Sequence, residues 1–463
     1  MKKRIYSILL VTLLLLCACQ PTPEEDVIVN RGEEDLNVLI QTTPAPDAVS
    51  IAEAAASALP TAEATEQQPE TSEISYTVVH LDETYSLGIG KAQVVFDADV
   101  TIPNVEHWAI DAVRRTNWTR DALRHTLEAA ADGQPIYSEW DGVTKSYLAD
   151  AVVAIENSEK VRAMDEIYRA SGEMTTKDKL LMDYESAPSS ITRTPLDWDK
   201  VGDGSLFCSF YRDDIGAYWN VMLFEGMLQC TAFDQIIQNE AMVRQGEYVG
   251  AKPGRELTNL SLSRTEAEEK AEAFLRSIGV TDVTLAESAC EKAQRVNLYT
   301  TEVQSEGWIL TYRKSIDGLS CIAPRAREQN PTDLAFTQGW QQESLSMYVD
   351  SSGIWQFLWN GRYELGERLS ESAALLDYDA AMELIRQRLR IENMSADDMG
   401  TRTVTVTDIT LGYCIVPQKD EKDVGVTLPV WIVNYTVDAS LAKASLYFGF
   451  AISALNGANI HLE

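Results

Sequence analysis

Apolar residues recur with the period of a helix at two places in the second half of the chain. Between Leu262 and Gly279 they are spaced so that one helical face is apolar. Ser263 and Glu266 form a capping box at the start of this helix, and Gly279 is placed to end it. A second helix begins near Asp377 and is predicted to bury one face, formed by Ala381, Leu384, Ile385 and Leu389.

Each predicted helix leads into strands of similar sequence. The pattern W-I-x-x-Y occurs at 308–312 and again at 431–435. Apolar residues alternate from Leu345 to Val349, then a Ser-Gly turn precedes a strand at 354–359. In the second copy the alternation over 446–452 reaches an Asn-Gly turn. The pattern predicts one helix and a small antiparallel sheet, twice over, and therefore an α+β fold class.

This order of helix and strands resembles PepSY-like domains. The segment that carries the resemblance is Val349-Asp350-Ser351-Ser352-Gly353-Ile354, similar to that family's strand, D-x-x-G, strand hairpin. The second copy keeps Gly457 but has Ala454 in place of the Asp. The arrangement is also similar to extracytoplasmic regulatory proteins of the YycH/YycI type. The resemblance implies tandem PepSY-like units at 255–372 and 373–463, a binding or regulatory role, and no catalytic residues to carry over.

The region 76–250 predicts a further, N-terminal α+β domain. Alternation from Val94 to Ile102 indicates a strand that ends at Pro103. Apolar positions predict a helix that ends near Gly133, and then one long helix over 147–170 with Leu148, Ala151, Val152 and Ile155 inward. Two strands follow at 205–211 and 217–224, and Lys252-Pro253-Gly254 is a natural joint before the repeated units.

The first nineteen residues indicate a secretory signal. Three basic residues precede an apolar run from Ile8 to Leu16, which is shorter than the roughly 20 residues of a membrane-spanning helix. Leu16-Cys17-Ala18-Cys19 resembles the lipobox of bacterial lipoproteins, which implies lipidation of Cys19 and anchoring at the extracellular face of the cell membrane. The alternative is a plain signal peptide with a chance cysteine. The whole chain resembles uncharacterised lipoproteins of Gram-positive, Clostridia-like bacteria.

Residues 20–75 are predicted to form an acidic tether. This stretch is rich in Pro, Ala, Thr and Glu and holds twelve acidic residues against one arginine. Few of its side chains are large enough to form a core, so an extended, solvated linker is expected. The whole chain has 71 acidic and 39 basic residues, a formal net charge of -32. Its net field repels nucleic acid and the anionic surface of a bilayer, so no nucleic-acid partner is predicted.

Candidate chemistry is sparse. The four histidines show no metal spacing, and the glycines around Gly90-Lys91 lack the first glycine of a phosphate loop. Asp197, Asp199 and Asp203 could bind Ca²⁺, but Val201 and Cys208 stand at ligand positions of an EF-hand loop. The sequence therefore predicts no metal, no cofactor and no catalytic residue.

Five cysteines remain beyond the signal: Cys208, Cys230, Cys290, Cys321 and Cys414. Cys208 with Cys230, or Cys290 with Cys321, could bridge neighbouring strands. Buried free thiols are the alternative, because cysteine also packs as a small apolar residue.

Trp355, Phe357 and Trp359 are predicted to share one face of a strand, with Ile354 and Leu358 on the other. Two interpretations are open. The strand is covered on both faces by a helix and a neighbouring domain, or the three aromatic residues form a partner-contact surface.

The sequence favours a lipid-anchored, extracytoplasmic binding or regulatory protein that acts by protein–protein contacts without catalysis. A membrane sensor or protease ectodomain is the expected class of partner. Two alternatives stay open: a cell-wall or peptide hydrolase whose carboxylates are distant in sequence, and a small-ligand carrier with a pocket in the region 76–250.

Overall fold

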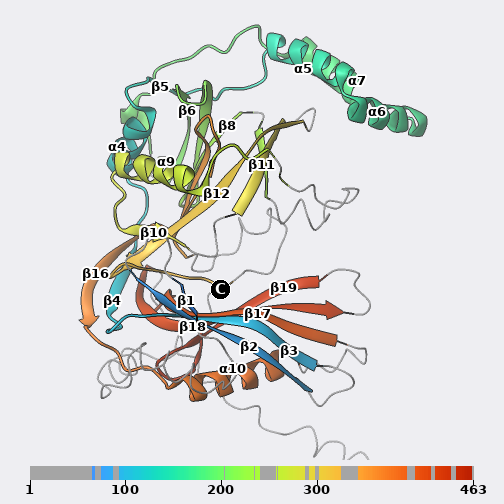
Figure 1. The fold of residues 1–463 in the computed structure, drawn as a ribbon. Coiled ribbons are helices and arrows are strands. Elements are labelled where there is room, and N and C mark those ends of the chain that lie inside the picture. Colours follow the sequence, from blue (N-terminus) through green and yellow to red (C-terminus); the bar gives the residue numbers. More distant parts are fainter. Residues whose placement is uncertain are drawn as a thin grey trace, which may run out of the picture.

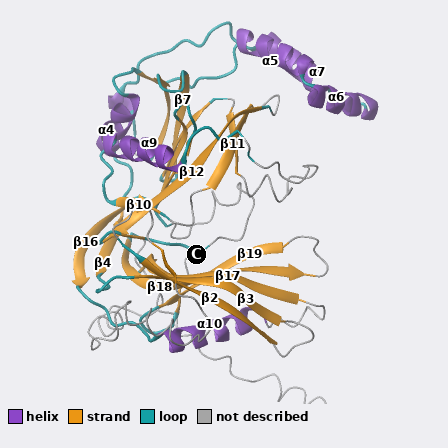
Figure 2. Cartoon of the chain, viewed as in Figure 1, coloured by secondary structure: helices purple, strands orange, loops and turns teal. Residues whose placement is uncertain are grey.

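Strands dominate the fold. The computed structural model describes residues 65–67, 74–86, 93–202, 204–233, 235–239, 257, 259–286, 291–297, 302–324, 342–393, 402–418, 423–439 and 445–460. Of these residues, 46% lie in strands and 26% in helices, and the strands form two large sheets (Figures 1 and 2). The predicted α+β class, with an N-terminal α+β domain and two tandem PepSY-like units, is therefore wrong.

The first sheet combines strands from the two ends of the described chain. Its order is β1-β2-β3-β17-β18-β19-β20, and β4 pairs with both β16 and β18. β3 runs parallel to β17, while the neighbouring pairs β2–β3 and β17–β18 are antiparallel. The strands are β1 (Thr65–Gln67), β2 (Tyr76–Ser86), β3 (Gln93–Pro103), β4 (Ile110–Arg115), β16 (Tyr363–Ser370), β17 (Arg402–Pro417), β18 (Val424–Ala439), β19 (Ser445–Ser453) and β20 (Asn459–Ile460).

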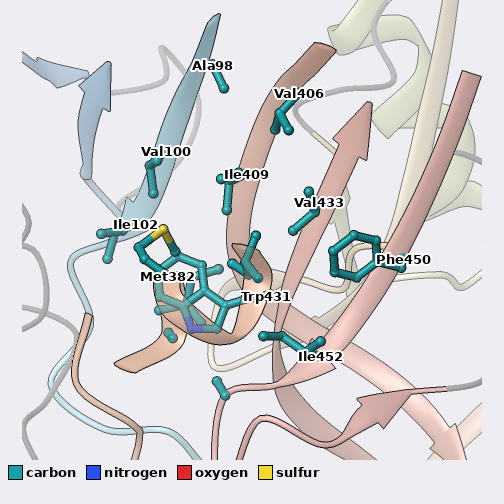
Figure 3. Packing of buried hydrophobic residues seen from close by; sticks show 14 of the residues in the cluster. Ala98, Val100, Ile102, Met382, Val406, Ile409, Trp431, Val433, Phe450 and Ile452 are labelled. Atoms are coloured by element: carbon teal, nitrogen blue, oxygen red, sulfur yellow. The ribbon is translucent and has the colours of Figure 1, made fainter. Parts of the chain in front are cut away.

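Helix α10 (Tyr378–Asn393) packs on one face of the first sheet. The helix begins as predicted, because the Asp377 carboxylate accepts a hydrogen bond from the Ala380 amide at 2.8 Å. Figure 3 shows Met382 of this helix among apolar side chains of β3, β17, β18 and β19. The predicted alternation in β3 is confirmed, and it places five side chains in this core: Val94, Phe96, Ala98, Val100 and Ile102.

The second sheet has the order β5-β6-β7-β8-β15-β14-β12-β11-β9, with β10 and β13 paired to β12. Its strands are β5 (Ile136–Tyr137), β6 (Ser205–Arg212), β7 (Ala217–Phe224), β8 (Met227–Ala232), β9 (Gln235–Asn239), β10 (Val283–Leu285), β11 (Glu291–Asn297), β12 (Val303–Ile316), β13 (Leu319–Ser320), β14 (Ser344–Val349) and β15 (Ile354–Asn360). The neighbouring strands β8 and β15, which come from different predicted units, are antiparallel.

Helices α4 (Arg120–Ala131) and α9 (Arg264–Ser277) pack on one face of the second sheet (Figure 1). Both helices were predicted, and the capping box of Ser263 and Glu266 is present at the start of α9. Phe274 of α9 packs edge-on against Trp219 and Phe357, with ring centroids 5.7 and 5.2 Å away. These contacts fix α9 on the sheet.

The error in the predicted fold concerns the number of strands and their pairing. Strands such as β3, β6, β7 and β15 lie where the sequence pattern placed them, but β2, β8, β16 and β17 were not predicted. β3 pairs with β17 and β8 pairs with β15, so strands from the region 76–250 contribute to both sheets. A small sheet leaves N–H and C=O groups unpaired at its edges, and a distant strand can satisfy them. Periodicity reports local conformation only, so it could not identify these partners.

Three helices form an arm beyond the second sheet (Figure 1). This arm consists of α5 (Lys145–Asn157), α6 (Glu159–Ser171) and α7 (Thr176–Ser186). The single helix predicted over 147–170 is broken at Ser158, whose extended backbone ends α5 and whose hydroxyl accepts a hydrogen bond from the Val161 amide at 3.4 Å. Serine favours this N-cap role over a helix interior, which explains the break.

Part of the predicted tether belongs to the first sheet, because β1 pairs with β2. Within the described ranges, no helix combines the length and the apolar composition needed to cross a bilayer. The predicted lipidation site Cys19, the signal segment, the Gly90-Lys91 loop, the joint at 252–254 and His461 lie outside the described residues.

Candidate functional site

The arm exposes more large apolar side chains than it buries. Its own small core consists of Leu148, Ala151, Ile155, Val161 and Leu180. The exposed set extends over all three helices and the connecting turn, and it comprises Val153, Met164, Ile167, Met174, Leu181, Met182 and Tyr184. Each large aliphatic side chain left in water forgoes roughly 1.5–3 kcal/mol of burial free energy. Exposed apolar side chains that adjoin one another on a helix are a feature of interaction surfaces.

Helix α6 presents the most exposed pair. Met164 and Ile167 lie one turn apart on the same face, with 42% and 61% of their surface exposed. The opposite face is fixed by Asp165, which is buried and accepts hydrogen bonds from the amides of Thr176 (2.7 Å) and Lys177 (3.3 Å). A carboxylate is favoured at the start of α7, where amides lack helical partners. This contact holds the exposed face of α6 in a defined orientation.

The chain segments that lead into and out of the arm are bound to the second sheet. The Trp140 indole donates a hydrogen bond to the Val221 carbonyl at 2.9 Å. The Asn220 side chain accepts from the Asp141 amide at 2.7 Å and donates to its carbonyl at 2.8 Å. Arg193, on the returning segment, pairs with the Asp141 carboxylate at 2.6 Å. The base of the arm is thus fixed on β7.

The second sheet has a polar face, defined as the face opposite α4 and α9. Strand register aligns Thr311, Ser346, Leu358 and Gln229 in one row across β12, β14, β15 and β8. The hydroxyls of Thr311 and Ser346 are hydrogen-bonded at 2.8 Å. A neighbouring row contains Gln356 and Thr231. Hydroxyl and amide groups at these positions can bind a polar ligand.

A buried ionic cluster closes one end of the polar face. Asp350 is fully buried and pairs with the Arg295 guanidinium at 3.2 Å. It also accepts hydrogen bonds from the Trp355 indole (3.0 Å), the Ser305 hydroxyl and two hairpin amides. The Arg295 guanidinium lies 3.5 Å from the centroid of the Trp355 ring. Because every oxygen of Asp350 is engaged, this residue of the predicted D-x-x-G hairpin stabilises the turn.

A second ionic cluster lies at the junction of the two sheets. Lys314 pairs with Glu343 at 3.2 Å and with Asp282 at 2.7 Å, and the Trp359 indole donates to Glu343 at 2.9 Å. Burial raises the pKa of Glu343, although the Lys314 charge opposes this effect. Burial lowers the pKa of Lys314, but the two carboxylates outweigh it and the pKa is raised. The pair therefore links β12 to β14 through a buried charge contact.

The three aromatic residues predicted as a partner-contact surface do not lie together on the surface. Phe357 and Trp359 are 1% and 7% exposed and belong to the core under α9. Trp359 packs edge-on against Trp118 at 5.0 Å. Trp355 is half-buried beside Arg295, because the register shifts at the start of β15. Phe357 and Trp359 thus occupy the positions that the covered-strand interpretation describes.

The cysteines that the structure describes carry free, buried thiols: Cys208, Cys230, Cys321 and Cys414. The suggested bridge between Cys208 and Cys230 is absent because both residues pair with Val221 from opposite sides. Two strand spacings separate them, about 9–10 Å, and a disulfide needs Cα atoms within about 7 Å. Cys321 is likewise unbridged, and Cys290 lies outside the described residues.

The acidic loop considered for Ca²⁺ shows local contacts instead. Asp197 begins a short 3₁₀ turn and pairs with Lys200 at 2.9 Å, and that side-chain hydrogen bond is the main reason the pKa of Asp197 is lowered. Asp203 is outside the described residues. Among the residues with described positions, no three His, Cys, Asp or Glu side chains gather closely enough to hold a metal ion.

The surfaces of the arm were not identified from the sequence. A signal was available, because on one continuous helix Ile167 would lie about 120° around the axis from Ile155. Two large apolar residues outside the predicted buried face, Met164 and Ile167, therefore pointed to a second apolar surface.

Comparison with known proteins gives no family. No protein-family profile matches the chain, and no curated protein matches it. Among solved structures, the chain is similar to an uncharacterized protein from Eubacterium rectale, with 13% sequence identity and a TM-score of 0.46. The match covers 81% of this chain and 91% of that one.

Proposed function

We propose that this protein is a binding protein that acts through contacts of its helical arm with a protein partner. The observation that carries the proposal is the exposed apolar surface of the arm, above all Met164 and Ile167 of α6. The arm projects beyond both sheets (Figure 2), so a partner can reach α6 without displacing either core.

The composition of this surface favours a protein partner. Three of its exposed side chains are methionines, which adapt to partner surfaces of different shape. Arg162, Glu166 and Arg169 are exposed on the side of α6 that faces away from Met164 and Ile167, so they leave the apolar pair accessible. Burying Ile167 and Met164 in a partner would contribute about 1.5–3 kcal/mol each.

The proposal includes the location of the protein. The lipobox-like segment at Cys19 and the acidic stretch that follows support a lipid-anchored protein at the extracellular face of the membrane. A membrane sensor or protease ectodomain is then the class of partner within reach. The wild-type protein should carry lipid on Cys19, and Cys19→Ser should lose both the lipid and the membrane anchoring that it provides. A wild-type protein whose mass shows no lipid would contradict the anchor.

Site-specific photocrosslinking tests the arm. A photoreactive residue replaces Ile167 in one strain and Ile391 in another, because Ile391 is also an exposed isoleucine on a helix, α10. In intact cells, position 167 should yield a discrete crosslinked protein that position 391 does not. Equal products at both positions, or none at position 167, would refute the proposal.

A second candidate function is carriage of a small ligand, and the polar face of the second sheet favours it. Its rows of hydroxyl and amide side chains lie opposite the helix-covered core. A ligand that binds there should raise the melting temperature of the purified protein. The variant Gln229→Ala should reduce that rise, and a rise that Gln229→Ala leaves unchanged would count against this location.

A further inference from the structure

A guanidinium and a hydroxyl lie opposite each other at the edge of the polar face. Arg313 of β12 lies directly opposite Thr284 of β10, so both side chains are on the same side of the sheet. The neighbouring β10 residues Val283 and Leu285 pack instead against the core under α9. This alternation places Arg313 and Thr284 on the polar face.

Neither group is satisfied within the part of the chain that the structure describes. The Thr284 hydroxyl is buried and has no hydrogen-bond partner there. The half-buried Arg313 guanidinium makes no hydrogen bond or ion pair with a described residue. A partly desolvated cation without a counter-charge is unfavourable, and so is a buried hydroxyl without a partner.

Among the described residues, none supplies a negative charge to Arg313. Burial lowers its pKa, and the groups that act on it electrostatically are the thiols of Cys414 and Cys321. Burial raises the pKa of Cys321 to about 12 and that of Cys414 further, so both are uncharged near neutral pH. An anion that entered this position would therefore meet an uncompensated positive charge.

Further hydrogen-bond donors lie next to Arg313. Thr311 is two residues away on the same strand face, and its hydroxyl is paired with that of Ser346. The group thus combines a planar fork of N–H donors with three hydroxyls. Such a set matches the oxygens of a carboxylate or phosphate and offers little to a cation.

We propose that Arg313 and Thr284, with Thr311 and Ser346, form a binding subsite for an oxyanion, the carboxylate or phosphate group of a small ligand. The rest of the ligand would lie along the polar face toward Leu358 and Gln229, which continue the row from Ser346. This subsite is separate from the arm and does not depend on the function proposed for it.

The test is anion binding by the purified full chain at constant ionic strength, with chloride as the reference anion. Inorganic phosphate and acetate are titrated separately by calorimetry, and the tighter of the two identifies the preferred group. Binding should raise the melting temperature, and the rise should continue with the logarithm of the anion concentration above Kd. Arg313→Gln should weaken binding about tenfold or more, and Thr284→Val about threefold to tenfold.

Matched variants keep the test decisive. Arg162→Gln removes the same charge from an exposed position on α6 and should leave anion binding unchanged. Arg313→Lys keeps the positive charge but loses the planar fork of N–H donors, so it should also weaken anion binding. This variant replaces Arg313→Gln in the test if Arg313→Gln fails to fold. No response of the wild-type protein to either anion, or equal responses in wild type, Arg313→Gln and Thr284→Val, would overturn the proposal. Ile167→Glu should bind the anion normally whether or not the arm binds a partner.

Discussion

Removal of the Asp350 carboxylate should destabilise the second sheet more than any exposed charge change. Asp350 is fully buried and has an ion pair with Arg295 and hydrogen bonds from Trp355, Ser305 and the amide of Ser352. Asp350→Ala leaves the Arg295 charge buried without its counter-charge. Breaking a buried pair in this way costs about 3–5 kcal/mol of unfolding free energy.

Two comparisons separate the ion pair from ordinary packing. In Asp350→Ala with Arg295→Met, the orphaned charge is gone, so the double variant should be less destabilised than the two single variants together. Glu128→Gln removes an exposed i,i+4 pair with Arg124 at 2.8 Å and should change stability by less than about 0.5 kcal/mol.

Urea unfolding provides the assay. Tryptophan fluorescence reports this region because Trp355 lies in the cluster itself. A midpoint shift equivalent to 3–5 kcal/mol for Asp350→Ala is expected. If Asp350→Ala loses no more than Glu128→Gln, the cluster does not stabilise the hairpin and the reasoning from burial fails.

Further predictions concern the core, the junction and the thiols. Trp359→Ala should cost about 3–5 kcal/mol in urea unfolding, because the ring is buried against Trp118; a loss below about 1 kcal/mol would contradict its place in the core. Burial raises the pKa of Glu343 above its ordinary value of 4.5, so the folded protein binds this proton more tightly than the unfolded chain does. The stabilisation is complete below pH 4.5 and is lost as the pH rises through the pKa of Glu343 in the folded protein. Glu343→Gln should lack this loss of stability, so its melting temperature should fall less than that of the wild type as pH rises above 4.5. The same pH profile in both proteins would contradict the raised pKa. Burial raises the pKa of Cys208 to about 12, so its thiol should be alkylated only after unfolding, with the same mass shift with and without reductant; alkylation of the folded protein would contradict its burial.

The sequence was most informative where structure is local. Ser263 with Glu266 and Asp377 each mark the start of a helix that the structure contains, because capping depends on neighbours within one turn. Alternation from Val94 to Ile102 located β3 for the same reason. Ser158 shows the limit of this approach, since one helix was predicted across a residue that ends α5 and begins α6.

Pairing between distant segments was beyond the sequence. The partnership of β3 with β17 depends on which edges remain open after all strands have formed, and one chain's periodicity does not contain that information. The proposed oxyanion subsite has the same origin. Arg313 and Thr284 are unremarkable in sequence, and only the register of β10 on β12 brings them together. The exposed face of α6 could have been predicted from the sequence, because the residues that form it are neighbours within one helix.

The most direct test of the proposed function compares Ile167→Glu with Ile391→Glu in the intact cell. Both substitutions place one negative charge at an exposed isoleucine of a helix, so both proteins should keep the wild-type melting temperature. The measured quantity is the amount of partner recovered after crosslinking from a neighbouring position on the arm. The account predicts that Ile167→Glu reduces recovery about tenfold or more while Ile391→Glu has no effect. Equal recovery from the two variants would contradict it.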